Sequence, residues 1–283
     1  MNEEIKDYCL DTYKFFYEKK FSELSSNGSQ DLSRQKEFEV AAQKYAIKHT
    51  IIDGMKIYPN QVAALWHAIY EAHIYRKSGI KDLNVIQNVI SADQSWKKSS
   101  GHAFEEMIKE LATLAMGKYP IEFILQKDLN TLIKAGELSN EPRDISWLKE
   151  QVKGNIFDLY IIYTRQNKKF CFGCVQCKTS IRDRVTRDRE PSIHAMESCF
   201  WSIVFVLDGD YLKNPKFQNM VNGGTKEFPE NGWHGMYDVS GVYNIGRIYP
   251  LDLDFKVLRK HSKKAAEDWM KRRQWFKNDW TPE

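Results

Sequence analysis

The chain of 283 residues lacks the sequence features of membrane and secreted proteins. No apolar run approaches the length needed to span a bilayer, and residues 1–20 are charged throughout, without the apolar core of a secretory signal. Cysteine is scarce: the five cysteines are odd in number and mostly clustered, which does not fit a disulfide framework. We therefore expect a soluble intracellular protein.

The chain also lacks a strong charge imbalance, internal repeats and low-complexity tracts. Its 42 lysines and arginines against 38 aspartates and glutamates leave a formal net charge of +4. That charge is too small to indicate a nucleic-acid partner by itself, but it permits one if the basic groups cluster. With 42% hydrophobic and 13% aromatic residues, the chain can bury a core, in one large domain or two small ones.

Helical periodicity dominates the first part of the chain. Apolar residues recur at helical spacing, Pro59 is typical of a helix start and Gly79 of a helix end. A stretch rich in turn-forming residues, Ser25–Ser33, separates the first two helices. The predicted helices span residues 1–24, 36–49, 59–77 and 101–116.

From about residue 120 the pattern changes to runs that are typical of strands. The predicted strands span residues 121–125, 156–163, 170–178, 200–207, 239–248 and 255–258, with further helices at 192–199 and 262–277. These patterns predict an α/β (α+β) protein. A helical N-terminal subdomain, residues 1–84, would precede the core, residues 85–283.

Two of the predicted strands carry residues suited to phosphodiester hydrolysis. Asp158 stands on the first strand, a polar turn follows, and the second strand delivers Lys178. A hairpin brings both side chains to one edge, where the carboxylate can bind a divalent metal and the lysine can orient or deprotonate water. A strand-end Asp and Lys are more often a surface pair, so this spacing needs support from other residues.

The hairpin lacks a second carboxylate, because Gln176 stands two residues before the lysine where nuclease patterns prefer an acid. Glu105, on a predicted helix, and Glu197, in the helix after the Arg-rich loop, are the candidates to supply it. Glu190 is a further candidate, which immediately precedes a proline. The alternative interpretation of each is a solvated helix carboxylate.

The loop Thr179–Glu190 alternates arginine with aspartate in the sequence TSIRDRVTRDRE. Arginine donates two hydrogen bonds to guanine O6 and N7, and a carboxylate accepts one from cytosine N4. Arg182, Asp183 and Arg184 are therefore candidates to recognise G and C in the major groove. The alternative is a solvated loop with local salt bridges, which contribute little stability.

These residues resemble the type II restriction endonucleases of the PD-(D/E)xK superfamily, and within it the group that recognises CCGG-centred DNA. That group carries a lysine and, a few residues later, an Arg-Asp/Glu-Arg motif, here Lys178 and Arg182-Asp183-Arg184. The group also moves its second active-site carboxylate onto a later helix, which fits the vacancy at Gln176. Upstream, residues 65–75 and 93–105 resemble the AgeI-like enzymes, and the long helical N-terminus resembles the BsaWI type.

The resemblance implies a mixed central sheet flanked by helices and a Mg²⁺-dependent cut within a palindromic site with a CCGG core. An example is W/CCGGW, where W is A or T, cut to leave a 5′ overhang. It also implies a homodimer, a partner DNA methyltransferase and a prokaryotic cytoplasm. In this resemblance Asp158, Lys178, Glu197 and Glu105 form the cleavage site, and the three acids among them bind the metal.

Two other functions stay open at this point. A sequence-specific DNA-binding protein on a decayed nuclease fold would explain Gln176 and would not cut DNA. A nuclease of the same superfamily that acts on structured or damaged DNA would leave no fixed fragment ends. Cys171, Cys174 and Cys177 have zinc-ligand spacing, but the alternating faces of a strand keep all three from converging.

Overall fold

The computed structural model describes residues 3–26, 32–180, 185–208, 210–239, 241, 243–251, 254–273 and 276–282. Its contacts divide the chain into two compact units, residues 1–95 and residues 96–283. The dividing point lies inside the long helix α4 (Leu83–Met116). The domain boundary predicted after residue 84 stays a prediction. None of the described helices combines the length and the apolar character needed to cross a membrane.

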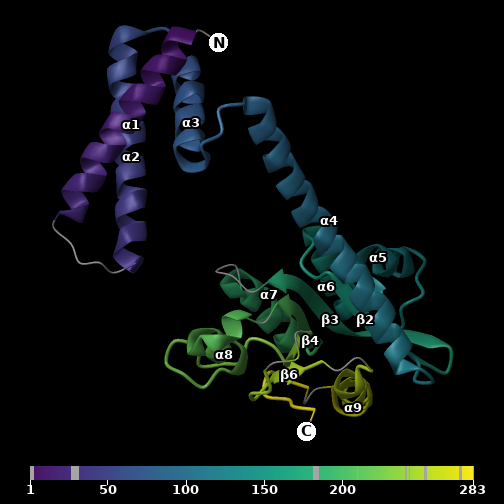
Figure 1. The fold of residues 1–283 in the computed structure, drawn as a ribbon. Helices are drawn as coiled ribbons and strands as arrows, with labels where there is room; N and C mark the ends of the chain where they lie inside the picture. Colours follow the sequence, from purple (N-terminus) through teal and green to yellow (C-terminus); the bar gives the residue numbers. More distant parts are fainter. Residues whose placement is uncertain are drawn as a thin grey trace. The chain divides into compact units, whose positions relative to one another are not determined.

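The first unit is built from three helices and the first turns of α4 (Figure 1). The three helices are α1 (Glu3–Ser25), α2 (Leu32–Ile57) and α3 (Val62–Ser78). Helix α1 packs against both others through a stripe of side chains that recur every four residues: Ile5, Cys9, Tyr13 and Tyr17. Small residues of α2 and α3 face this stripe, which allows close approach of the helices.

The helix predictions for this region are confirmed in outline, with corrections to the bounds of three helices. Helix α2 spans Leu32–Ile57 rather than residues 36–49. Gly79 ends α3 in the left-handed conformation (φ 72°), as expected, but α3 begins at Val62 rather than at Pro59. Helix α4 begins at Leu83 rather than at residue 101. The polar stretch before residue 101 stays helical because apolar residues continue the helical spacing on both sides of it, at Ile86 and at Phe104.

The second unit holds a six-stranded mixed sheet in the order β1-β2-β3-β4-β5-β6. The strands are β1 (Ile121–Leu125), β2 (Leu159–Arg165), β3 (Lys168–Ser180), β4 (Trp201–Asp208), β5 (Gly235–Asp238) and β6 (Ile248–Pro250). β1, β2 and β3 pair antiparallel, and β4, β5 and β6 continue parallel to β3. The predicted mixed sheet is confirmed.

Two strand predictions near the C-terminus are wrong. Residues 239–248 are mostly a connection between β5 and β6, where Gly241 and Gly246 take positive φ angles of 72° and 60°. Residues 255–258 begin helix α9 (Lys256–Arg272), because Leu258 starts an apolar helical face that Ala265 and Trp269 continue.

Helices cover both faces of the sheet. Helices α4 and α9 pack with one face around Phe172 and Trp201. The other face is covered by α5 (Gln126–Lys134), α6 (Pro142–Gly154), α7 (Val185–Glu197) and α8 (Pro215–Asn222), which follows a short 3₁₀ turn, Asp210–Lys213. The start of β2 and the end of β3 therefore emerge between two helical layers.

The β2–β3 hairpin is confirmed, and it contains a β-bulge between Ile161 and Ile162 of β2 opposite Phe172. The bulge places Cys171 and Cys174 in the same cluster, beside α6, whereas Cys177 packs against the opposite cluster. All three thiols are free. The three cysteines do not converge, in agreement with the argument against a zinc site.

Candidate active site

The hairpin places Asp158 beside the end of β3. The Asp158 backbone N–H donates to the Val175 carbonyl at 2.9 Å, and the Cys177 N–H donates to Asp158 Oδ2 at 2.6 Å. The backbone of β3 thus fixes the Asp158 carboxylate at Cys177, the residue directly before Lys178. The structure brings together the aspartate and the lysine of the predicted hairpin.

Charged groups surround this carboxylate. Burial raises the pKa of Asp158, the Lys178 ammonium and the Cys177 N–H lower it, and the nearby carboxylates of Glu105 and Asp188 raise it again. A buried carboxylate with two further acids within electrostatic reach is poised to bind a cation, because a cation would relieve both burial and repulsion.

A second carboxylate of the site comes from α7, at Asp188. Its Oδ1 lies 3.2 Å from Lys178 Nζ, and both side chains are about one-quarter exposed, at 25% and 29%. Asp188 was not predicted as a site residue, because the alternating Arg-Asp sequence around it predicted a loop. A signal was available: Ser192 and Ala195 follow at helical spacing and are fully buried against the sheet.

Gln176 is buried between β3 and α7 and holds Asp188 in place. Its amide nitrogen donates to the Asp188 carbonyl at 3.0 Å, and its amide oxygen accepts from the indole N–H of Trp233 at 2.8 Å. The side chain therefore needs one donor and one acceptor, which a carboxylate cannot supply. This requirement accounts for an amide at a position where nuclease patterns prefer an acid.

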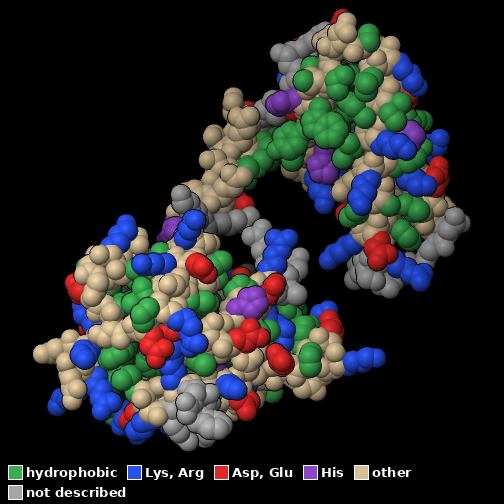
Figure 2. Space-filling view, turned by 180° about the vertical axis from the view of Figure 1, so that it is seen from behind, with side chains coloured by type: hydrophobic (Ala, Val, Ile, Leu, Met, Phe, Trp, Pro, Cys, Tyr) green, Lys and Arg blue, Asp and Glu red, His purple; other side chains and the backbone are tan. Residues whose placement is uncertain are grey.

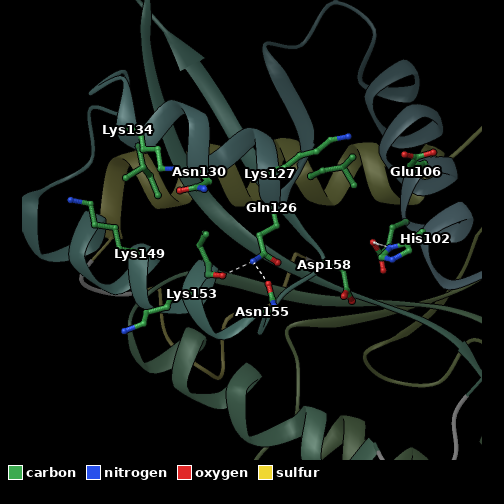
Figure 3. A pocket seen from close by; sticks show the side chains of 14 residues that line it. His102, Glu106, Gln126, Lys127, Asn130, Lys134, Lys149, Lys153, Asn155 and Asp158 are labelled. Atoms are coloured by element: carbon green, nitrogen blue, oxygen red, sulfur yellow. Dashed lines mark hydrogen bonds and ion pairs between the residues drawn. The ribbon is translucent and has the colours of Figure 1, made fainter. Parts of the chain in front are cut away.

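Glu105 approaches the site from α4. It is 21% exposed, and its Oε2 lies 3.3 Å from Nδ1 of His102, one helical turn earlier. Both residues line a groove of about 960 Å³ together with Asp158 (Figure 3). The structure therefore brings Glu105 to the predicted cluster.

Glu197 and Glu190 lie elsewhere. They line a second cavity of about 540 Å³ with Trp147 and His194. Asp188 and Glu197 are nine residues apart on one helix, which places them on opposite sides of α7 at 100° per residue. The structure does not bring Glu197 to Asp158 and Lys178, and the acid of α7 that lies beside Lys178 is Asp188.

The predicted DNA-recognising residues Arg182, Asp183 and Arg184 lie outside the described residues. β3 ends at Ser180 and α7 begins at Val185, so the three residues fall between the lysine and the Asp188 helix. Their role stays a prediction.

The donor set fits a magnesium ion rather than a soft metal. In the part of the chain that the structure describes, no three His, Cys, Asp or Glu side chains could hold a metal ion on their own. Mg²⁺ is usually bound through one or two carboxylates together with water and substrate phosphates. Asp158, with Asp188 and Glu105 nearby, supplies that kind of incomplete oxygen site.

The chain is similar to known restriction endonucleases. The family described as "BsaWI restriction endonuclease type 2" matches residues 139–275. The structure of BsaWI in a pre-specific complex with DNA is 51% identical in sequence, over 99% of this chain and 98% of that chain, with a TM-score of 0.86. The structure of AgeI bound to DNA is 16% identical over 92% of each chain, with a TM-score of 0.42. No curated protein matches.

The match with BsaWI runs through both units and includes the hairpin, α4 and α7, because it spans nearly the whole of both chains. On this likeness the chain belongs to the BsaWI restriction endonuclease family and is a type II site-specific deoxyribonuclease.

Proposed function

We propose that this enzyme hydrolyses double-stranded DNA in the presence of Mg²⁺ at a palindromic site with a CCGG core. The site has the form W/CCGGW, and the cut leaves a 5′ overhang. The observation that carries the proposal is the Asp158 carboxylate, held by the Cys177 N–H beside Lys178 and Asp188. DNA as substrate is supported by the BsaWI relative, which is bound to DNA in its structure.

We assign each residue of the site a role in the proposed hydrolysis. Asp158 and Asp188 bind the divalent ion, with Glu105 as a further acid at the groove. Lys178, as an ammonium, orients the attacking water and neutralises charge that develops on the phosphate. When bound, the ion would lower the pKa of a coordinated water and stabilise the phosphate charge. We assign the displaced carboxylate to Asp188 instead of Glu197 because only Asp188 contacts Lys178.

Sequence recognition is proposed for Arg182, Asp183 and Arg184. Arginine and aspartate have the donors and acceptors that the major-groove edges of G and C require. Their place between Lys178 and α7 would put base recognition beside the scissile phosphate.

The active assembly is proposed to be a two-fold symmetric homodimer, because a palindrome offers the same site on each strand. Exposed apolar side chains recur every four residues on α3, at Val62, Trp66 and Tyr70. Figure 2 shows apolar side chains gathered on the visible face of this first unit. We propose that this face takes part in the dimer interface. A prokaryotic cytoplasm and a partner methyltransferase complete the proposed restriction–modification system.

Digestion of phage DNA with Mg²⁺, followed by sequencing of the fragment ends, tests the proposal. We expect discrete fragments whose ends share a CCGG core and carry 5′ overhangs. Fixed ends at another sequence would overturn the proposed site and leave the enzyme class intact. Intact DNA in Mg²⁺, together with specific binding in a gel shift, would favour the non-cleaving DNA-binding protein.

A further inference from the structure

The groove beside Asp158 has a wall of lysines that the proposed hydrolysis does not use. Lys127 and Lys134 project from α5, and Lys149 and Lys153 from α6. We call these four residues the lysine wall. The spacing of seven residues on α5 and of four on α6 keeps each pair on one side of its helix. All four are exposed.

The charges in the groove are separated. Figure 3 shows Lys134, Lys149 and Lys153 on one side of Gln126 and Asn155, and Lys127 on the other side with Glu106, Asp158 and His102. The groove therefore has a basic end at Lys134, Lys149 and Lys153, and another end that holds the cleavage residues together with Lys127.

The backbone beneath the lysine wall is held firmly. The Gln126 amide donates to the Val152 carbonyl and, at 2.6 Å, to Asn155 Oδ1. Asn155 itself closes α6 in the left-handed conformation, with a φ of 50°. These bonds tie the start of α5 to the end of α6, so the spacing between the two lysine pairs is set before any ligand arrives.

The lysine wall also differs from neighbouring lysines in its partners. Lys109 pairs with Asp128 at 3.7 Å, and Lys169 pairs with Glu137 at 2.7 Å. Within the described part of the chain, no member of the lysine wall forms an ion pair. Four unneutralised cations in one groove repel one another, and a polyanion that lies across them would relieve this repulsion.

We infer that the lysine wall binds consecutive backbone phosphates of the cleaved DNA strand, beside the scissile phosphate. The inference rests on the proposed DNA substrate. A DNA strand carries one negative charge per roughly 3.4 Å of helix axis, so a strand whose scissile phosphate reaches Asp158 extends further charges along the same groove. Phosphate contacts of this kind fix the register of the duplex and carry no sequence information.

The test compares pairs of substitutions that remove equal charge. The variants K127Q/K134Q and K149Q/K153Q remove the α5 and α6 halves of the wall. The variant R165Q/K168Q is the matched control: both residues are exposed, lie at the β2–β3 turn at the far end of the strands, and do not line the groove. Affinity for a CCGG-core duplex is measured in Ca²⁺ over a range of KCl concentrations.

We expect each wall variant to weaken binding to the CCGG duplex and to an unrelated duplex by the same factor. The slope of log K against log salt should become shallower by about 0.9 for each phosphate that is no longer neutralised, and the control should keep the wild-type slope. Neutral methylphosphonate linkages, placed one at a time along the cleaved strand, locate the phosphates that the lysines bind. A linkage that weakens wild-type binding near the cut should have no further effect on the combined four-lysine variant.

Two results would overturn the inference in distinguishable ways. If the wall variants match the control in slope and affinity, the four lysines are solvated in the complex. That result would refute the proposed phosphate contacts and leave the DNA substrate unaffected. If the wild type shows no salt-dependent DNA binding in Ca²⁺, the DNA substrate itself is refuted along with it.

Discussion

Helix α6 contributes side chains to two cavities that contain similar residues and differ in how those residues are held. In the groove, Asp158 accepts a backbone hydrogen bond from β3 and lies beside Lys178 and Asp188. The second cavity has Glu190 and Glu197 with a histidine and an arginine nearby, all on one short helix. Acids alone therefore do not make the site. The groove differs because a strand end fixes a carboxylate next to a lysine there.

The rotation of α7 decides which acids belong to which cavity. Asp188 shares the side of the helix that carries the buried Ser192 and Ala195, and Ser192 is anchored by a 2.7 Å hydrogen bond to Ser202 of β4. Glu197 lies half a turn away and faces the second cavity. The two cavities therefore differ in which side of α7 supplies their acids.

The largest effect is expected from Asp158→Asn. The amide keeps an acceptor for the Cys177 N–H but removes the charge that binds the metal. Loss of several kcal/mol of transition-state stabilisation corresponds to a fall in single-turnover cleavage of about a thousandfold or more. Specific binding in Ca²⁺, measured by gel shift, should persist. Near-normal cleavage would place the metal site elsewhere.

The next largest effect is expected at Gln176, which joins the Asp188 helix to the sheet. Gln176→Met leaves the Trp233 N–H and the Asp188 carbonyl without their partner, so kcat should fall by about ten- to a hundredfold with little change in KM for DNA.

The variant Gln176→Glu tests whether residue 176 positions Asp188 for catalysis or only stabilises the fold. A protonated glutamate can donate to the Asp188 carbonyl and an ionised one cannot, so this variant should regain activity relative to Gln176→Met as the pH falls. Parallel pH profiles of the two variants would contradict the positioning role.

A smaller effect is expected on the free energy of unfolding of the metal-free enzyme, which depends on the ionisation of Asp158. Because burial raises the pKa of Asp158, the folded state binds its proton more tightly than the unfolded state does. The stability of the metal-free enzyme therefore falls as the pH rises from the unfolded pKa to the raised folded pKa, and it stays lower above that window.

Asp158→Asn should therefore unfold at a higher temperature than the wild type in EDTA at pH 7.5. Each kcal/mol recovered corresponds to about 2–4 °C in Tm for a unit of this size. The gain should shrink as the pH falls into the window. A Tm equal to or below that of the wild type at pH 7.5 would contradict the burial cost.

The smallest effect is expected in the second cavity. Glu190→Gln should change cleavage by less than about twofold, because an exposed substitution away from the site has little energetic consequence. A large fall in the cleavage rate of this variant would remove the distinction between the two cavities.

Much of the site could be predicted from local pattern. The apolar runs of β2 and β3, with a polar turn between them, predicted the hairpin, and the hairpin predicted that Asp158 and Lys178 meet. The role of Glu105 followed from the resemblance of residues 100–105 to known enzymes, not from periodicity.

The rest depends on tertiary placement. Helices α5, α6 and α8 were missed although each has an apolar face. Helices α5 and α8, with nine and eight residues, are shorter than the span over which helical spacing is recognised. Helix α6 is longer, and Pro142 at its start was an available signal. Choosing Asp188 over Glu197 required the orientation of α7 on the sheet, which the Gln176 and Ser192 hydrogen bonds determine. The division of charge along the groove likewise became visible only once α5 and α6 were in place.

We propose that the cleavage centre uses the sheet-facing side of α7. The most direct measurement is single-turnover cleavage of a CCGG-core duplex in Mg²⁺ by Asp188→Asn and Glu197→Gln, side by side at saturating enzyme. We expect a fall of about a hundredfold or more for Asp188→Asn, in line with removal of a metal ligand, and a near-wild-type rate for Glu197→Gln. The reverse pattern would contradict this proposal and assign the displaced carboxylate to Glu197.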